Sequence, residues 1–116
     1  MGRSTNAPAS RQRRKKILKA AKGYRGRRKS IISVAKDAVL RANAYAYRHR
    51  RLRKRDFRSL WITRISAAAK KEGLSYSRFI YGLKQQGIDI DRKMLSDLAI
   101  SDAPNFSKLA ALIRSN

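Results

Sequence analysis

The sequence lacks cysteine altogether, and its 116 residues include one histidine and only seven acidic residues. Without cysteine the chain can form no disulfide, thiol nucleophile or Cys/His zinc site. No apolar run approaches the ~20 residues that span a bilayer, and the first ten residues lack the apolar core of a signal peptide. We therefore expect an intracellular protein with no cofactor, no metal, no membrane partner and no small-molecule substrate.

Positive charge is what the sequence has in abundance. Its 30 lysines and arginines give a formal net charge of +23 and a pI near 11.6. Charge of one sign at this density opposes compaction unless a polyanion neutralises it, and nucleic acid is the commonest such partner. Composition alone therefore favours a nucleic-acid-binding protein.

The positive charge is concentrated in the first half of the chain. Residues 1–58 hold 21 basic and 2 acidic residues, whereas residues 59–116 hold 9 and 5. The first half also has few large apolar residues, so by itself it should be disordered or loosely helical. We predict a basic extension over residues 1–58, followed by a small all-helical domain over residues 59–116 that includes the end of a long helix.

Helix-forming residues and glycines divide the extension into three pieces. The segment 11–22 (RQRRKKILKAAK) favours a short helix with Ser10 as its N-cap. Gly23 and Gly26 predict a bend after it. The next 46 residues contain neither glycine nor proline, which predicts one helix over most of residues 30–71. At a rise of 1.5 Å per residue that helix is roughly 60 Å long.

The end of the long helix carries an apolar stripe at helical spacing, which predicts that this end packs into the domain. The stripe consists of Phe57, Leu60, Trp61, Ile65, Ala68 and Ala69. We place Phe57 and Trp61 in the core in preference to a stacking role on RNA.

Three short helices are predicted after the long one. Ser75 caps a helix over residues 76–86 that ends at Gly87, and Asp91 caps a helix that ends near Ile100. Leu74 with Phe79, and Ile90 with Leu95, form hydrophobic staples at these two starts. Asp102 and Pro104 begin the last helix. Its inward face is Phe106, Leu109, Ala110 and Ile113. No alternating strand pattern occurs, so the predicted fold class is all-α.

The basic segments are predicted to contact RNA directly. Seven of the eleven residues from Arg48 to Arg58 are basic. At about 100° per residue they place charge on every helix face, which suits a crevice in folded RNA better than a duplex groove. A solvated face or a localisation signal does not explain positive charge that runs over more than fifty positions. The predicted contacts in the extension are Arg11, Arg13, Arg14, Lys15, Lys16, Lys19, Lys22, Tyr24, Arg25, Arg27, Arg28, Lys29, Tyr47, Arg48, His49, Arg50, Arg51, Arg53, Lys54, Arg55 and Arg58.

Other classes of protein fit the sequence less well. An architectural DNA-binding protein remains an alternative, since the charge alone allows it. A leucine zipper is disfavoured because Gly73 ends the helix fifteen residues after Arg58. A membrane-active helix would need an apolar face that the most basic stretch lacks. Asp89 and Asp91 are more simply turn and cap residues than a catalytic pair, so we expect no enzyme.

Four segments of the chain closely resemble the large-subunit ribosomal protein twenty family of bacteria and plastids, the L-twenty family. They are KKILKAAKGYRG (15–26), AYAYRHRRLRKRDFRSLWITRISAAA (44–69), GLSYSRFIYGLK (73–84) and IDIDRKMLSDLA (88–99). The resemblance covers essentially the whole chain. The first ten residues differ from the basic start expected of the family, because Arg3 is their only charged residue.

The resemblance implies a structural constituent of the large ribosomal subunit, located in the bacterial cytoplasm, or in the plastid stroma if organelle-encoded. It further implies that the long helix threads into 23S ribosomal RNA (rRNA) and that the protein promotes early assembly of the subunit. Neighbouring ribosomal proteins are expected partners, and in some relatives the C-terminal domain also represses translation of its own messenger RNA. Residues of the domain that could read an RNA surface are Arg64, Tyr76, Ser77 and Arg78.

Overall fold

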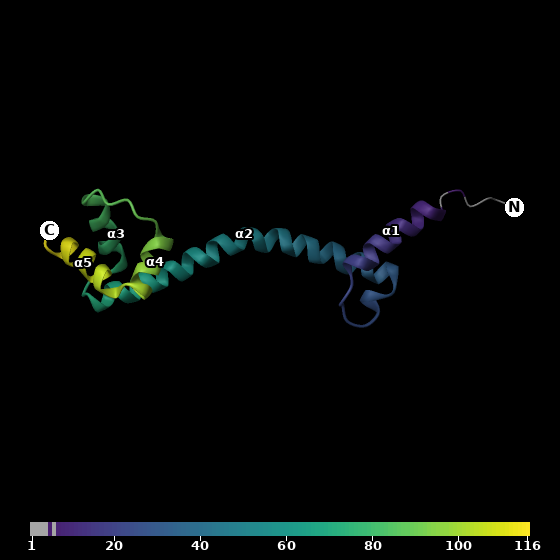
Figure 1. The fold of residues 1–116 in the computed structure, drawn as a ribbon, viewed down its shortest axis with the longest axis horizontal. Helices are drawn as coiled ribbons and strands as arrows, with labels where there is room; N and C mark the ends of the chain where they lie inside the picture. Colours follow the sequence, from purple (N-terminus) through teal and green to yellow (C-terminus); the bar gives the residue numbers. More distant parts are fainter. Residues whose placement is uncertain (1–4, 6) are drawn as a thin grey trace. The chain divides into compact units, whose positions relative to one another are not determined.

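The computed structural model describes residue 5 and residues 7–116, and over these residues it contains helices and no strand (Figure 1). This confirms the predicted all-α class. The elements are α1 (Ala7–Ala20), the 3₁₀ helix η1 (Gly26–Lys29), α2 (Ile32–Lys71), α3 (Tyr76–Gln85), α4 (Arg92–Ser101) and α5 (Ala103–Arg114).

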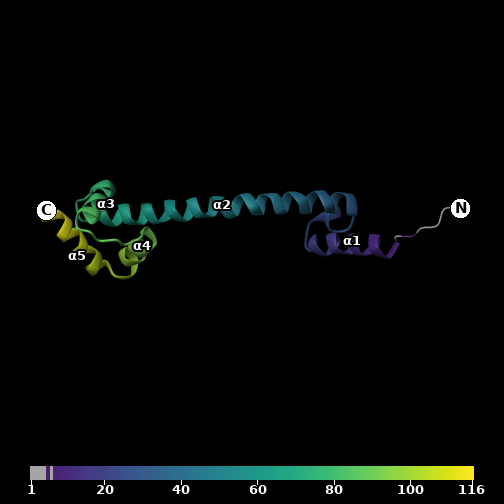
Figure 2. The same cartoon turned by 90° about the horizontal axis from the view of Figure 1, so that it is seen from above.

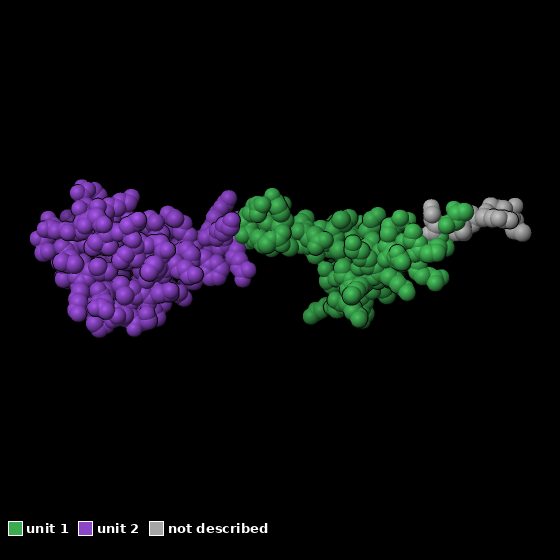
Figure 3. Space-filling model, turned by 45° about the horizontal axis from the view of Figure 1, so that its top comes forward, with its two compact units in different colours: residues 1–51 green, residues 52–116 purple. Residues whose placement is uncertain are grey.

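The chain divides into two compact units, residues 1–51 and residues 52–116 (Figure 3). The 40-residue helix α2 contributes its first half to one unit and its second half to the other. Its bounds confirm the single long helix predicted from the absence of glycine and proline. The predicted functional boundary between residues 58 and 59 stays a prediction.

Helix α1 begins earlier than its sequence pattern suggested. It starts at Ala7, so Ser10 lies inside the helix and is not its N-cap, and the capping prediction is wrong. Pro8 is compatible with this earlier start, because the first turn of a helix needs no backbone N–H donor. The helix consequently begins one turn earlier than predicted, and the added turn carries no charge.

Residues 21–31, which include η1, join α1 to α2, and the last turns of α1 lie beside the first turns of α2 (Figures 1 and 2). Gly23 and Gly26 both have positive φ, at 89° and 63°, which confirms the predicted bend. Residues other than glycine rarely adopt a positive φ. Ala21 and Ala35 are the buried hydrophobic residues of this unit in the part of the chain that the structure describes. Two alanines are a very small core for a highly charged segment.

The core of the second unit lies where the end of α2 meets the three short helices. Its buried members are Ile65, Ala69, Leu74, Phe79, Leu83, Leu95, Phe106 and Ala110. The rings of Phe79 and Phe106 stack with their centroids 4.9 Å apart, joining α3 to α5. Burying each leucine, isoleucine or phenylalanine of this cluster contributes about 1.5–3 kcal/mol. The predicted inward face of α5 and both staples contribute to this cluster.

The predicted caps of α3 and α4 are present. Ser75 Oγ accepts a hydrogen bond from the Arg78 amide at 3.3 Å, and Asp91 Oδ1 accepts one from the Met94 amide at 2.8 Å. Each satisfies one of the unpaired amides at a helix start. Gly87 has a φ of 70° and follows the end of α3, as predicted.

Three residues of the predicted stripe lie outside the core, and one of them, Leu60, is 41% exposed. Phe57 is 44% exposed, and Trp61 is half-buried but does not belong to the buried cluster, so the core prediction is wrong for Phe57 and only partly met for Trp61. Their rings lie 6.2 Å apart on successive turns of α2. The cluster that α2 forms with the short helices includes residues of α2 only from Ile65 onward. The apolar stripe therefore continues beyond the surface that covers it.

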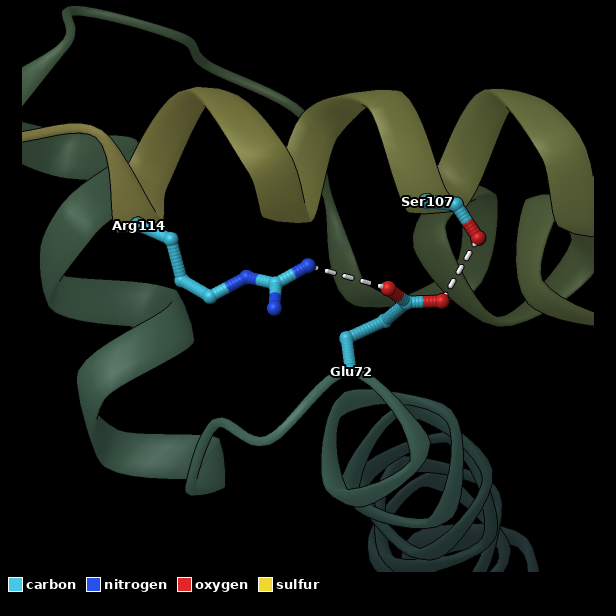
Figure 4. Close-up of polar contacts among 3 residues, drawn as sticks. All are labelled: Glu72, Ser107 and Arg114. Atoms are coloured by element: carbon cyan, nitrogen blue, oxygen red, sulfur yellow. Dashed lines mark hydrogen bonds and ion pairs between the residues drawn. The ribbon is translucent and has the colours of Figure 1, made fainter.

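Polar contacts also join the end of α2 to α5 (Figure 4). Ser107 Oγ donates a hydrogen bond of 2.6 Å to Glu72 Oε1, and Arg114 Nη2 lies 3.3 Å from Glu72 Oε2. Figure 4 shows both side chains reaching from α5 toward the same carboxylate. Glu72 thus links two positions two turns apart on α5 to the C-terminal end of α2.

Candidate nucleic-acid interface

The basic residues of α1 are all exposed. Arg11, Arg14 and Lys15 are spaced as neighbours on one side of the helix, while Arg13 and Lys16 fall on other sides. No residue of α1 is buried. The predicted contacts Arg11, Arg13, Arg14, Lys15, Lys16, Lys19 and Lys22 are thus all available to a partner.

The turn after α1 presents the next group. Arg27, Arg28 and Lys29 form the short 3₁₀ helix, and all are exposed, as is Arg25 before it. Tyr24 is half-buried. Gly26 has a positive φ, and three consecutive cations follow it directly in the 3₁₀ helix.

The middle of α2 is exposed on all sides. Every residue from Arg41 to Arg51 is exposed, and so are all those from Arg53 to Arg58. The predicted contacts Tyr47, Arg48, His49, Arg50, Arg51, Arg53, Lys54, Arg55 and Arg58 therefore all face solvent. Leu52, which is not a predicted contact, is the one half-buried residue between Arg41 and Arg58.

Aromatic rings on α2 lie next to guanidinium groups. The Arg51 guanidinium lies 4.0 Å from the ring centroid of Tyr47, within the range of a cation–π contact. Arg48 lies 5.7 Å from the ring of Tyr45, and that ring also stacks on His49 at 5.8 Å. These pairs hold flat cationic and aromatic surfaces next to one another, which suits both phosphate contact and base stacking.

The predicted contacts carry no acidic partners. Across residues 5 and 7–116 the single ion pair joins Arg114 to Glu72, and neither residue belongs to the predicted contacts. The guanidinium and ammonium groups of residues 7–58 are thus free to bind an external anion. This leaves a strongly basic surface without internal neutralisation.

The predicted contacts in the second unit are less uniform. Arg64, Ser77 and Arg78 are exposed. Tyr76 is half-buried against the core, and its hydroxyl accepts a hydrogen bond of 2.8 Å from Arg92 Nε. Tyr76 therefore has a packing role, and the part of its ring that stays accessible is small.

Three residues near the turn are not among the contacts predicted from the sequence. Asp37, Arg41 and Tyr45 line a groove between the first turns of α2 and the turn after α1. Their spacing of four residues places them on one face of a helix, a signal that is present in the sequence. The sequence alone does not reveal the groove, because its opposite wall comes from the turn after α1 and the position of that turn depends on the fold.

Two kinds of site are absent from the described part of the chain. Residues 5 and 7–116 contain no group of three or more acidic or histidine side chains placed to hold a metal ion. No helix over the same residues is long and apolar enough to cross a membrane.

The fold and this surface define a class: small all-helical proteins in which a strongly basic, exposed extension precedes a compact helical unit. The family model for ribosomal protein L20 matches residues 3–109. The chain belongs to the ribosomal protein L20 family, which confirms the resemblance drawn from the sequence. The family consists of structural ribosomal proteins and not enzymes.

The relatives of the chain share this assignment. The large ribosomal subunit protein bL20 of Pelobacter propionicus is 53% identical over 116 residues, covering all of this chain and 99% of the relative. That of Aromatoleum aromaticum is 56% identical over 110 residues, covering 95% and 92%. That of Pelotomaculum thermopropionicum is 52% identical over 114 residues, covering 98% and 97%.

Proposed function

We propose that this protein is a structural constituent of the large ribosomal subunit that binds 23S rRNA directly and promotes early assembly of that subunit. The observation that carries the proposal is the unpaired positive charge on every side of α1 and the middle of α2. The names of its bL20 relatives supply the ribosomal context. Other large-subunit proteins are its expected neighbours, and the bacterial cytoplasm its expected location.

The mechanism follows from charge neutralisation. Each rRNA phosphate that meets an arginine or lysine releases condensed counterions, which favours binding entropically. Converging RNA helices repel one another, and cations placed between them remove that repulsion. The cations in the middle of α2, among them Arg48, Arg51 and Arg55, lie between the RNA helices, and the cations of α1 reach deeper into the RNA.

Folding of the first unit is coupled to this binding. With only Ala21 and Ala35 buried, the first unit gains little from hydrophobic burial, whereas its like charges repel. RNA supplies the missing counter-charge, so the helices become stable on the RNA. A protein that orders itself and its RNA together is suited to an early assembly step.

The proposal is tested by a salt titration of the full chain on a folded fragment of 23S rRNA, with duplex DNA of equal length as competitor. A binder of folded RNA keeps its preference for the rRNA fragment at ~0.3 M salt, where purely phosphate-driven affinity falls by orders of magnitude. Equal binding of both ligands, weakening together, would support the architectural DNA-binding alternative instead.

We propose repression of its own messenger RNA as a separate role. It would use the second unit, whose exposed Arg64 and Arg78 could contact a folded RNA element. Translation of the messenger in a cell-free extract, with and without added protein, tests it. Unchanged translation at concentrations that saturate the rRNA fragment would remove this role.

A further inference from the structure

A groove in the first unit is lined by small, aromatic, basic and acidic residues, whereas binding by charge alone requires only basic ones. It lies between the first turns of α2 and the turn after α1, with a volume of about 860 Å³, in the range of small-ligand sites. One wall is a single face of α2, at spacings of three and one residues. That wall consists of Ser33, Val34, Asp37, Ala38, Arg41, Ala42 and Tyr45.

The shape of the groove suits a flat ring. Ala38 and Ala42 on α2 and Gly23 in the turn contribute little or no side chain to its lining. A β-carbon at Gly23 would meet no atom beyond its chain neighbours within 4 Å, so the space beside these residues, the slot, is open. Tyr24 and Tyr45 line the same slot, and Tyr45 is 53% exposed. Tyrosine rings are stacking surfaces for unstacked bases in single-stranded or extruded nucleic acid.

Both basic and acidic side chains line the groove. Arg25, Arg28 and Arg41 line it and offer donors to a phosphate. Asp37 lines it too, although it is one of only two acidic residues among the first 58. Within the described residues Asp37 forms no ion pair, even with three arginines on the same groove. An unpaired carboxylate in a basic surface weakens attraction for RNA unless it accepts hydrogen bonds from the RNA itself.

We propose that this groove binds one unstacked guanine nucleotide of the RNA, an inference that rests on the proposed rRNA binding. Guanine is the RNA base whose Watson–Crick edge offers two adjacent N–H donors, N1–H and N2–H, and an ionised carboxylate accepts both. The base lies in the slot beside the tyrosines and donates to Asp37. Its phosphate lies against the arginines.

The sharpest test is the sign of the effect of Asp37→Asn on binding to the rRNA fragment. Removing a negative charge strengthens the binding of a plain polycation. Here it removes the paired acceptor, so affinity falls by at least about fivefold, the effect of losing one bidentate base contact. Asp56→Asn is the matched control, since Asp56 is the other acidic residue of the extension and does not line the groove. It leaves affinity unchanged or slightly raises it.

A second pair of variants tests the slot without altering charge. Ala42→Leu places a larger side chain in the groove, whereas Ala44→Leu adds the same side chain outside it. Only the first is expected to weaken binding, and equal helix content by circular dichroism excludes a folding effect. Equal affinities for the two variants would count against the slot.

Chemical modification by kethoxal, which attacks N1 and N2 of unpaired guanine, supplies a direct readout. The wild-type protein protects one guanine of the bound fragment, and Asp37→Asn exposes it while the rest of the footprint remains. Failure of the wild-type protein to bind the fragment would overturn the proposed function. Wild-type binding with an Asp37→Asn variant that binds equally or better, with no guanine exposed, would overturn the groove proposal alone.

Discussion

Ile113 of α5 packs directly against the backbone of Gly82 in α3. A β-carbon at position 82 would overlap Ile113 Cγ2 and lie 3.0 Å from Cγ1, so the side chain of Ile113 fills the space that a larger residue would need. Glycine inside a helix ordinarily weakens that helix. The close approach of α3 and α5 is therefore the reason for a glycine at this position.

We expect Gly82→Ala to lower the free energy of unfolding of the second unit by about 1–3 kcal/mol, because overpacking forces the two helices apart. Helix propensity by itself would raise it by up to about 1 kcal/mol. Urea denaturation of the full chain, followed by circular dichroism, distinguishes these signs. In an Ile113→Ala background the cost should shrink, and an unchanged cost there would contradict the packing explanation.

Ser96→Ala should stabilise the second unit. Ser96 is fully buried in α4, and its hydroxyl has no hydrogen-bond partner among the described residues. Removing an unsatisfied buried hydroxyl recovers about 1 kcal/mol, and alanine also favours helix. Thermal unfolding provides the measurement. Ser101→Ala is the control, since Ser101 is exposed and donates to the Asp97 carbonyl, and its effect should stay within about 0.5 kcal/mol.

The two partners of Glu72 should contribute unequally. Ser107→Ala is expected to cost about 1 kcal/mol, because it removes a short, partly buried hydrogen bond. Arg114→Ala should cost less than about 0.5 kcal/mol, since the Arg114 side chain is 51% exposed and solvent screens the pair. Unfolding in 1 M salt should abolish the small Arg114 effect and leave that of Ser107. The opposite order would mean that the ion pair dominates.

Replacing one exposed arginine of α2 should alter the salt dependence of RNA binding. With Arg50→Gln, the slope of log affinity against log salt should fall in magnitude by about 1, as expected for one lost phosphate contact. Lys93→Gln removes the same charge from an exposed site on α4 outside the predicted contacts. An equal change in both slopes would mean that net charge, and not the position of the cation, governs binding.

Circular dichroism of the full chain should show a gain of helix when the rRNA fragment is added. The small core of the first unit makes its helices marginal without a polyanion, whereas the second unit has a buried cluster of its own. The free protein should therefore unfold in one transition that belongs to the second unit. Full helix content before RNA is added would contradict coupled folding.

Local patterns in the sequence predicted much of the fold. The caps Ser75 and Asp91 lie where their side chains can accept the first amides of a helix, and such contacts span three residues. The bend at Gly23 and Gly26 is equally local. The start of α1 was misjudged because Ser10 has a cap-forming side chain, but residues from Ala7 onward also form helix. The helix thus begins before Ser10, although the Ser10 side chain is of a type that caps helices.

The sequence by itself determined the helical class, the long α2 and the unneutralised positive charge, because periodicity, glycine placement and charge act over a few residues. Only the tertiary structure decided which part of the apolar stripe is buried, leaving Phe57 exposed and Ile65 enclosed. It also decided that Asp37, Arg41 and Tyr45 share a groove with the turn around Tyr24. Burial and grooves depend on which distant segments meet, and no spacing along one helix specifies its partner.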